Sequence, residues 1–569
     1  MTHQPAPNGS SHSPNTMVQS HVIDAARPMR IVCIGAGISG ICTGIRFPQE
    51  IKNLDLVIYE KNSDVGGTWY ENRYPGVRCD IPSAGYQFTF ENNSQWSEFL
   101  AGGAEIQEYL TRTAKKYGVY NYCKFNHMFR SAKWHQDRGK WEVVVENLIT
   151  HETFADTADV VLTASGILNK WDWPNIPGIH SFRGPKLHTA CWDDSIDVED
   201  KHVAVIGGGS SGIQLVPTLQ PRVKHMDHYM KGKNWISPLG MGSGLLKSRG
   251  IKTGNFKHTA EELEQFRGEP DTYLTFRRKV EQELNAAQLS VFMGTQMQIE
   301  FYKMALDSHK SKLKDRPDIY DALTPSWVPG CRRLTPGPGY LEACCAENVE
   351  FISTDIKMIH ANSIETIDGI CRPIDILCCA TGFDVQRKEL DITGLGGKTL
   401  NELWKPYPEA YLSVCPLAMP NLFMYLGPNG GPLAGSTVQM IEWVCDYMIQ
   451  LVQKMQREYI KSMVISPQAN AAFSAHVNQY FKTTIFTQSC ASWYKQGKSG
   501  DSRVVTPWPG SSVHARKALR SPRYEDFIYE VLPEVQDNCL AWLGNGMTQA
   551  QMQSEDTTDY LDGVAPGKM

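Results

Sequence analysis

The chain has 569 residues, 41% of them hydrophobic, and its 56 basic and 61 acidic residues give a formal net charge of −5 at pH 7. This length and composition predict a globular protein of several domains with sizeable cores. The near balance of charges, without a long basic run, gives no electrostatic reason to expect nucleic acid or an anionic membrane as a partner, so small molecules are the expected ligands.

The fifteen cysteines are scattered and form no CxxC pair, so neither a metal site nor a disulfide framework is expected. A reducing, cytoplasmic location fits this usage. No uncharged apolar run approaches the roughly 18 residues that span a bilayer, so no membrane partner is expected. Residues 1–28 are rich in Ser, Asn, Pro and His and lack the apolar core of a signal peptide, which predicts a disordered tail.

A first dinucleotide loop follows a short apolar strand at 31–34, where Gly35, Gly37 and Gly40 form a GxGxxG turn that runs into a helical pattern. Glycines at this spacing allow a tight turn and the approach of a pyrophosphate to a helix N-terminus. The next apolar strand ends at Glu60, where a carboxylate is suited to bind a ribose hydroxyl. This site therefore suits FAD.

The same pattern recurs after a strand at 203–206, which indicates a second dinucleotide site. Its second strand leads to Lys231, almost where the first unit has Glu60, and a cation there favours the 2′-phosphate of NADPH over NADH. The alternative for Lys231, taken alone, is a solvated surface charge, and phosphate binding is favoured over it. The residues expected to hold this second dinucleotide are Gly207, Gly209, Ser210, Ser211 and Gly212.

Two further segments complete the predicted organisation. Charged, helix-patterned sequence at 255–325 indicates a helical insertion, and a buried strand near 375–384 ends in a glycine turn. The fold class is therefore α/β, with two Rossmann-like doubly wound dinucleotide-binding domains and a helical insertion. The expected boundaries are 29–172 for the first part of the FAD domain, 173–240 and 329–374 for the NADPH domain, 241–328 for the insertion, and 375–569 for the second part of the FAD domain with a C-terminal active-site loop.

Chains that bind both flavin and NADPH include disulfide reductases and monooxygenases. The reductases need a redox cysteine pair spaced CxxC or CxxxxC, and no cysteines here have either spacing. Monooxygenases need no redox-active side chain, because the reduced flavin itself reacts with oxygen. The cysteine pattern therefore favours a monooxygenase.

Two longer motifs resemble one flavoenzyme family, the type I Baeyer–Villiger monooxygenases of the class B flavoprotein monooxygenases. The linker before the second glycine loop carries the family's fingerprint residues Phe182, Gly184, His188 and Trp192. The segment at 67–80 carries Gly67-x-Trp69, then Tyr74-Pro75-Gly76, then Asp80. The resemblance covers about residues 30–517.

The resemblance implies an enzyme that uses FAD, NADPH and O2 to convert a ketone into an ester or lactone through a C4a-peroxyflavin. It implies that Arg333 stabilises the anionic oxygen species, that Asp80 holds Arg333, and that Trp493 lies on a mobile loop near the nicotinamide. Arg332 would reach the NADPH 2′-phosphate with Lys231. The family's flavin contacts fall here on Gly67, Thr68, Trp69, Asp80 and Tyr86. His188 is expected to act indirectly, within a hinge-like connector that reads as neither ordinary helix nor ordinary strand.

Two alternatives stay open at this stage: a class B monooxygenase that oxidises sulfur or nitrogen, and a flavin-binding redox sensor without catalysis. A monomer or weak homo-oligomer is expected. The sequence does not identify the ketone, because the shape of the substrate pocket depends on loop contacts that spacing does not reveal.

Overall fold

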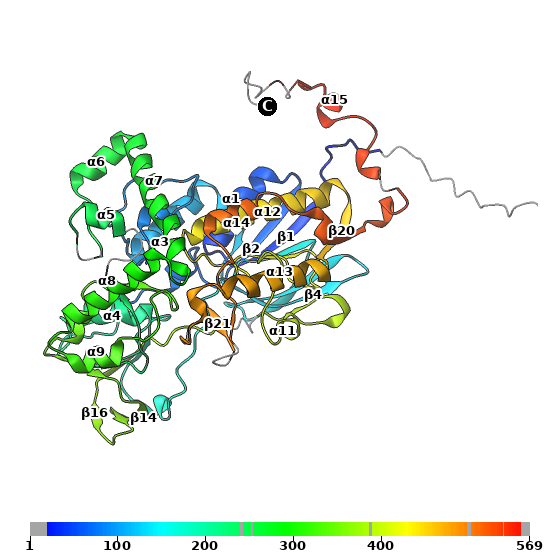
Figure 1. The fold of residues 1–569 in the computed structure, drawn as a ribbon. Coiled ribbons are helices and arrows are strands. Elements are labelled where there is room, and N and C mark those ends of the chain that lie inside the picture. The colour runs from blue at the N-terminus through cyan, green and yellow to red at the C-terminus, as the bar shows by residue number, and fades with distance from the viewer. Residues whose placement is uncertain are drawn as a thin grey trace, which may run out of the picture.

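A computed structural model describes residues 20–238, 243–251, 254–385, 390–497, 502–538, 540–558 and 561. Its first layer is a five-stranded parallel sheet, seen near the centre of Figure 1. The strand order is β19 (Leu422–Met424), β7 (Val160–Thr163), β1 (Met29–Ile34), β2 (Leu54–Tyr59) and β3 (Cys123–Lys124). Strands β1 and β7 are apolar and almost wholly buried, as expected of a parallel sheet covered on both faces.

Helices cover one face of this sheet, and a mixed four-stranded sheet covers the other. The helical face holds α1 (Ile38–Glu50), α3 (Gly103–Lys116) and α12 (Thr437–Arg457), whose apolar residues form the largest core cluster. The opposite face packs through Val32 and Val161 against Trp141 of this four-stranded sheet. That sheet has the order β18 (Ile392–Thr393), β4 (His127–His135), β5 (Lys140–Asn147) and β6 (Thr153–Ala158).

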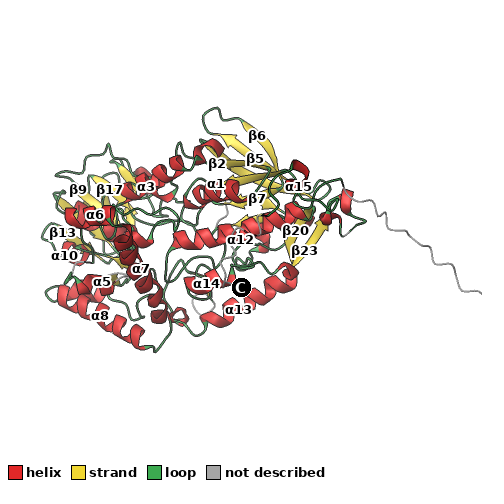
Figure 2. Cartoon of the chain, turned by 90° about the horizontal axis from the view of Figure 1, so that it is seen from above, coloured by secondary structure: helices red, strands yellow, loops and turns green. Residues whose placement is uncertain are grey.

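A second parallel sheet forms a separate body, on the left in Figure 2. Its order is β13 (Val349–Ile352), β10 (His225–Tyr229), β9 (His202–Ile206), β17 (Ile376–Cys379) and β8 (Lys186–His188). One face packs on α4 (Ser210–Leu219) and α10 (Tyr340–Cys344). The other is covered by the antiparallel strands β14 (Ile356–Ile359), β15 (Ser363–Thr366) and β16 (Cys371–Pro373). The predicted α/β class with two Rossmann-like domains is confirmed.

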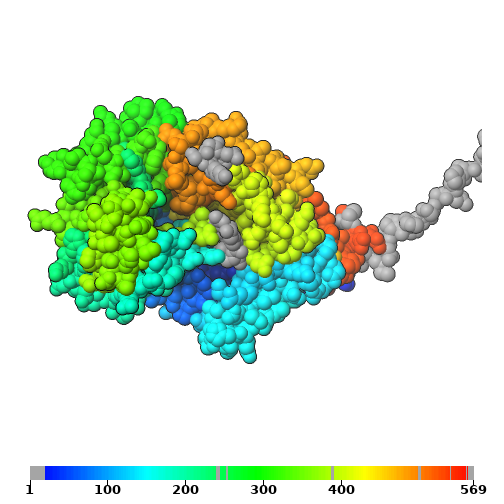
Figure 3. Space-filling view, turned by 90° about the horizontal axis from the view of Figure 1, so that it is seen from below, coloured from blue at the N-terminus to red at the C-terminus, as the bar shows by residue number. Residues whose placement is uncertain are grey.

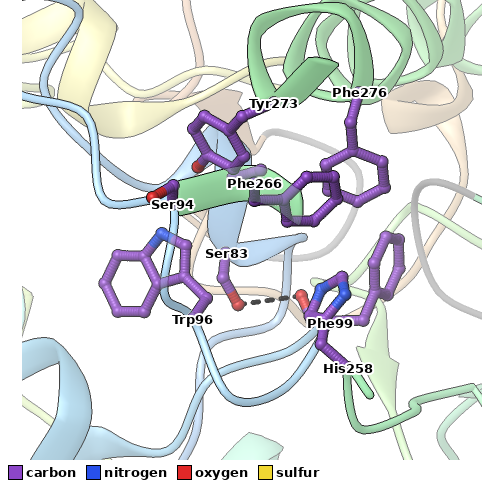
Figure 4. A pocket seen from close by; sticks show the side chains of 9 residues that line it. Ser83, Ser94, Trp96, Phe99, His258, Phe266, Tyr273 and Phe276 are labelled. Carbon is purple, nitrogen blue, oxygen red and sulfur yellow. Dashed lines mark hydrogen bonds between the residues drawn. The ribbon is translucent and has the colours of Figure 1, made fainter. Parts of the chain in front are cut away.

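Between β11 (Ile236–Ser237) and β12 (Thr335–Pro336) lie the helices α5 (Ser243–Ser248), α6 (Ala260–Gly268), α7 (Pro270–Ala286), α8 (Gln296–Lys312) and α9 (Pro317–Leu323). Helix α7 contacts the first domain, whereas α8 contacts β11 and α10 of the second. Figure 4 shows Phe266, Tyr273 and Phe276 of α6 and α7 facing Trp96 and Phe99 of the first domain across a cavity of about 10 Å³. This cavity holds one water at most, so it is a packing seam and no substrate site.

The remaining elements are short or peripheral. They are α2 (Thr68–Glu71), α11 (Leu400–Leu403), α13 (Pro467–Phe481), α14 (Ser512–Ala518), α15 (Gln549–Gln553), β20 (Ile460–Ile465), β21 (Lys495–Gln496), β22 (Arg503–Val504) and β23 (Phe527–Val531). Within the part of the chain that the structure describes, no helix combines the length and the apolar character needed to cross a membrane.

Three sequence-based expectations need correction. Residues 20–28 are bound to the protein rather than forming a free tail, since Arg27 ion-pairs with Asp159 and Ile23 N–H donates to the Met547 carbonyl; residues 1–19 lie outside the described residues. Strand β17 pairs with β9, so the expected boundary at residue 375 is too early. The linker contains β8, because its backbone completes the edge of the second sheet beside β17.

Candidate active site

The first glycine loop connects β1 to α1. Gly35 has a φ of +104°, and a Cβ there would lie 2.7 Å from the Ala164 carbonyl oxygen, while a Cβ on Gly40 would collide with the Gly35 carbonyl. These two glycines are required by the fold itself. Gly37 differs, because among the described residues an added Cβ would meet only the backbone of Gly67, with Cα at 3.6 Å and N at 3.9 Å. The open side of Gly37 is thus a cradle at the N-terminus of α1 that fits a pyrophosphate.

Glu60 lies beside this cradle at the end of β2. It is 4% exposed, and its carboxylate accepts hydrogen bonds from Ala36 N–H at 2.6 Å and Asn62 N–H at 2.9 Å. Burial raises the pKa of Glu60, although the two backbone hydrogen bonds oppose this shift. Each carboxylate oxygen keeps a second lone pair, which can accept a hydrogen bond from a ribose hydroxyl.

The predicted flavin-contact segment folds against the same loop. Gly67, with a φ of +54°, brings its backbone against Gly37, and α2 begins at Thr68. Trp69 Nε1 donates a hydrogen bond of 3.1 Å to the Tyr86 hydroxyl, and the two rings meet edge to face. The structure therefore brings Gly67, Thr68, Trp69 and Tyr86 together at the mouth of the first loop.

The second loop repeats the geometry of the first. Gly207 has a φ of +116° and packs on the Ala380 carbonyl, and a Cβ on Gly212 would collide with the Gly207 carbonyl. Around Gly209, at the N-terminus of α4, no described atom lies within 4 Å of an added Cβ. Ser210 Oγ bonds Thr335 Oγ1 at 2.5 Å, and Ser211 interacts with Tyr74 from the first domain.

The two predicted phosphate-binding bases lie near each other beyond β10. Arg332 Nη1 donates to the Lys233 carbonyl oxygen at 2.9 Å, and Lys231 Nζ lies 3.1 Å from Asp355 Oδ2. The Lys231 side chain is 81% exposed, so its pair with Asp355 contributes little stability and can be exchanged for a ligand phosphate. The joint contact of Arg332 and Lys231 with the 2′-phosphate of NADPH stays a prediction.

Arg333 and Asp80 form a bidentate ion pair between the two domains. Arg333 Nε and Nη2 each donate a hydrogen bond of 2.7 Å to one Asp80 oxygen. Burial alone would lower the pKa of Arg333, but the charge of Asp80 raises it overall. The Tyr494 hydroxyl also interacts with this guanidinium. Two fixed hydrogen bonds hold the guanidinium plane in one orientation, and the cation stays charged at every working pH.

A disulfide joins Cys331 to Cys490, 159 residues apart in the chain, with a Cα–Cα distance of 6.1 Å. The expectation that the cysteines form no disulfide is wrong for this pair, because the fold brings together two segments whose spacing carried no signal. The bridge ties the Arg333 segment to the loop of Trp493, whose ring packs 4.6 Å from that of Tyr494. Trp493 is partly buried against the cluster around Phe486 and Val504.

His188 is a buried structural group at the end of β8. Its Nδ1 accepts from Ala190 N–H at 3.1 Å, so the proton is on Nε2, which donates to Thr381 Oγ1 at 3.1 Å. The ring stacks on Trp171 with centroids 4.5 Å apart. Burial lowers the pKa of His188 to about 4, which keeps the imidazole neutral.

The other fingerprint residues also fix this connection. Phe182 is buried in the core of the second sheet, and Trp192 packs at its opposite face. A Cβ on Gly184 would collide with the Asp375 carbonyl, so the chain passes close to the start of β17 there. The fingerprint therefore builds the edge of the second domain rather than a catalytic group.

Comparison with known proteins agrees with this geometry. Residues 28–236 match the family described as flavin-binding monooxygenase-like. The chain is 37% identical over 548 residues to the FAD-binding monooxygenase tazF of Aspergillus terreus, covering 94% of this chain and 95% of that protein. It is 30% identical over 501 residues to a Baeyer–Villiger monooxygenase of Pseudomonas aeruginosa, covering 87% and 90%. The chain belongs to the type I Baeyer–Villiger monooxygenases.

Solved structures of this family have the same fold. Steroid monooxygenase bound to NADP superposes with a TM-score of 0.74 at 25% identity, covering 88% of this chain and 99% of that chain. OTEMO in complex with FAD and NADP gives a TM-score of 0.76 at 22% identity, covering 89% and 100%. The resemblance that the two long motifs indicated is confirmed at the level of the family and the fold.

Sequence reasoning missed two parts of this family member's site. No sequence motif singles out Tyr494. The signal that could have found it is its position directly after Trp493, an expected active-site residue. The Cys331–Cys490 bridge was missed because no pattern in the chain pairs those residues. Both belong to the contact between the arginine segment and the C-terminal loop.

Proposed function

We propose that this protein is a Baeyer–Villiger monooxygenase that binds FAD at the Gly35–Gly40 loop and NADPH at the Gly207–Gly212 loop, and that it converts a ketone into an ester or lactone with O2. FAD reduced by NADPH supplies the activated oxygen. The remaining chemistry, which is the binding of both cofactors and the stabilisation of developing negative charge, falls to the residues of the chain.

The Arg333–Asp80 pair carries the proposal. Asp80 follows the segment that holds Trp69 near the first loop, and Arg333 follows Arg332, which contacts the loop beyond β10. The pair therefore connects the chain segments that border the two proposed cofactor cradles. Attack on a ketone places negative charge on the former carbonyl oxygen, and a guanidinium fixed by two hydrogen bonds stabilises that charge without reorganising.

The contact between the domains supports this placement. The Tyr74 hydroxyl donates to Gln214 Oε1 at 2.8 Å, and Gly76 packs on Thr218 of the same helix, α4. The surface is hollowed where the green body at the left meets the orange and yellow segments (Figure 3). A ketone and the nicotinamide would meet the flavin at this junction.

The test measures NADPH consumption over matched panels of ketones, sulfides and amines, and identifies the products by mass. Products one oxygen heavier from ketones, formed in proportion to the NADPH consumed, support the proposal. Oxygenation of sulfides or amines alone would replace it with heteroatom oxidation. NADPH consumption that yields only hydrogen peroxide with every substrate would favour a flavin protein without oxygen transfer.

A further inference from the structure

A cluster of two histidines and one aspartate lies in the second domain, away from the cofactor cradles. His202 and His225 are the first residues of β9 and β10, and the register of the parallel strands pairs them directly. Asp227 lies two residues after His225 and therefore on the same face of the sheet. The three side chains gather at the N-terminal ends of these strands, opposite the end that carries the Gly207 loop.

Asp227 is a buried carboxylate that makes no well-formed hydrogen bond in the part of the chain that the structure describes, and its close charged contacts are His202 and His225. The residue is 0% exposed, and among the described residues neither of its oxygens, nor His202 Nε2, has a hydrogen bond of acceptable geometry. A carboxylate buried in this way is costly unless a charge or a metal ion compensates it. Arg372 of the covering strand β16 interacts electrostatically with Asp227, but its guanidinium is hydrogen-bonded to Glu350 through Nε and Nη2.

The ligand atoms have the spacing of a metal site. His202 Nε2 and His225 Nε2 lie 3.2 Å and 3.3 Å from the same oxygen, Asp227 Oδ1, and the ligand atoms all lie within 4.8 Å of one another. A tetrahedral Zn²⁺ ion with bonds of about 2.0 to 2.1 Å holds its ligand atoms about 3.3 Å apart. The rings stand nearly perpendicular, at 86°, so each can present its nitrogen without a clash.

From this geometry we propose that His202, His225 and Asp227 bind one Zn²⁺ ion. Two imidazoles and one carboxylate suit a borderline cation, whereas Mg²⁺ and Ca²⁺ require oxygen ligands. The histidine side chains are 28% and 36% exposed, so water has access to a fourth position. The ion would bridge the starts of β9 and β10, far from the reacting groups. Its expected effect is to stabilise the second domain.

The test uses the full chain with flavin bound, free of any affinity tag and stripped of metal with a chelator. Equilibrium dialysis against Zn²⁺, with metal quantified by mass spectrometry, should give about one ion per chain and a higher melting temperature. Co²⁺ in place of Zn²⁺ should give the visible absorption of a tetrahedral nitrogen and oxygen site. Asp227→Asn and His225→Gln should each weaken binding by about 100-fold or more, since even changes behind metal ligands cost 10- to 100-fold.

Two controls keep the result specific. His151→Gln alters an exposed histidine outside the cluster and should leave binding unchanged. A second set of potential metal ligands is His360, Glu365 and Cys371, but Glu365 is already paired with Lys357 at 2.7 Å. His360→Gln should therefore also leave Zn²⁺ binding unchanged. Equal Zn²⁺ binding by wild type and Asp227→Asn, loss of binding in His360→Gln, or no stoichiometric binding to the wild type would overturn the proposal.

Discussion

Within each dinucleotide loop the glycines serve different purposes. Gly35, Gly40, Gly207 and Gly212 contact backbone carbonyls of the protein, so a side chain at any of them disturbs folding. An added Cβ on Gly209 would meet no described atom within 4 Å and one on Gly37 only Gly67 at ordinary contact distance, so we expect a larger side chain at either position to meet the proposed cofactor. This difference separates the residues that build the fold from those that make room for a ligand.

Gly37→Val and Gly209→Val should therefore both fold but lose different ligands. Gly37→Val is expected to purify without its flavin, whereas Gly209→Val should keep the flavin and bind NADPH at least 10-fold more weakly, which corresponds to about 1.4 kcal/mol. Flavin absorbance per chain and NADPH titration measure the two effects. Full flavin occupancy in Gly37→Val would contradict the assignment of the first loop.

His188 should contribute to acid sensitivity. Burial lowers its pKa from an ordinary 6.5 to about 4, so between these pH values the unfolded chain binds the proton and the folded chain does not. The contribution of His188 to the stability of the fold is therefore fully present above pH 6.5, and it is lost as the pH falls toward 4. Melting temperatures over this range should fall less steeply in His188→Gln than in the wild type. The variant should keep part of the pH dependence of its melting temperature, because burial also lowers the pKa values of His228 and His309 to about 4.

A matched substitution isolates this effect. His151→Gln changes a histidine whose side chain is 78% exposed, and it serves as the control for losing an imidazole that is not buried. If His188→Gln and the wild type melt with the same pH dependence, the buried imidazole is not the group that titrates.

At the scale of elements, the segment 331–333 and the loop 490–496 act as one unit. The Cys331–Cys490 bridge and the contact between Arg333 and Tyr494 hold the loop against the arginine segment. A bond from Lys495 Nζ to the Gln488 carbonyl at 2.6 Å fixes the loop internally. A covalent tie two residues from Arg333 limits how far the guanidinium can move from its place beside Asp80.

Cys490→Ser should therefore keep bound flavin but lose oxygenation several-fold, because Arg333 and the Trp493 loop become less well positioned. A thiol reductant should impose a similar loss on the wild type and none on Cys490→Ser. A non-reduced digest should contain the linked peptides of Cys331 and Cys490. Wild-type activity that is indifferent to reductant, despite proven cleavage of the bridge, would show that the tie has no role in positioning.

At the scale of the whole molecule, the sequence predicted the two nucleotide-binding domains because their glycine loops and flanking strands are local patterns. The motifs around Asp80 and Arg333 also predicted the ion pair, although 253 residues separate its members. Contacts without a local pattern could not be predicted. The disulfide, the anchoring of residues 20–28 beside Asp159 and the assignment of β17 to the second sheet depend on packing between distant segments.

The central claim is that Arg333, held by Asp80 where the segments that border the two proposed cofactor cradles are connected, supports oxygen insertion into a ketone. The direct measurement compares wild type and Arg333→Ala under ¹⁸O2 with a ketone that the panel has identified, following both anaerobic reduction of the flavin by NADPH and the labelled ester. The wild type should form an ester carrying one ¹⁸O atom. Arg333→Ala should still reduce its flavin but form this ester about 100- to 1,000-fold more slowly, the usual cost of removing a charge partner from a transition state. Labelled ester at the wild-type rate from Arg333→Ala, or a wild-type ester without ¹⁸O, would contradict the account.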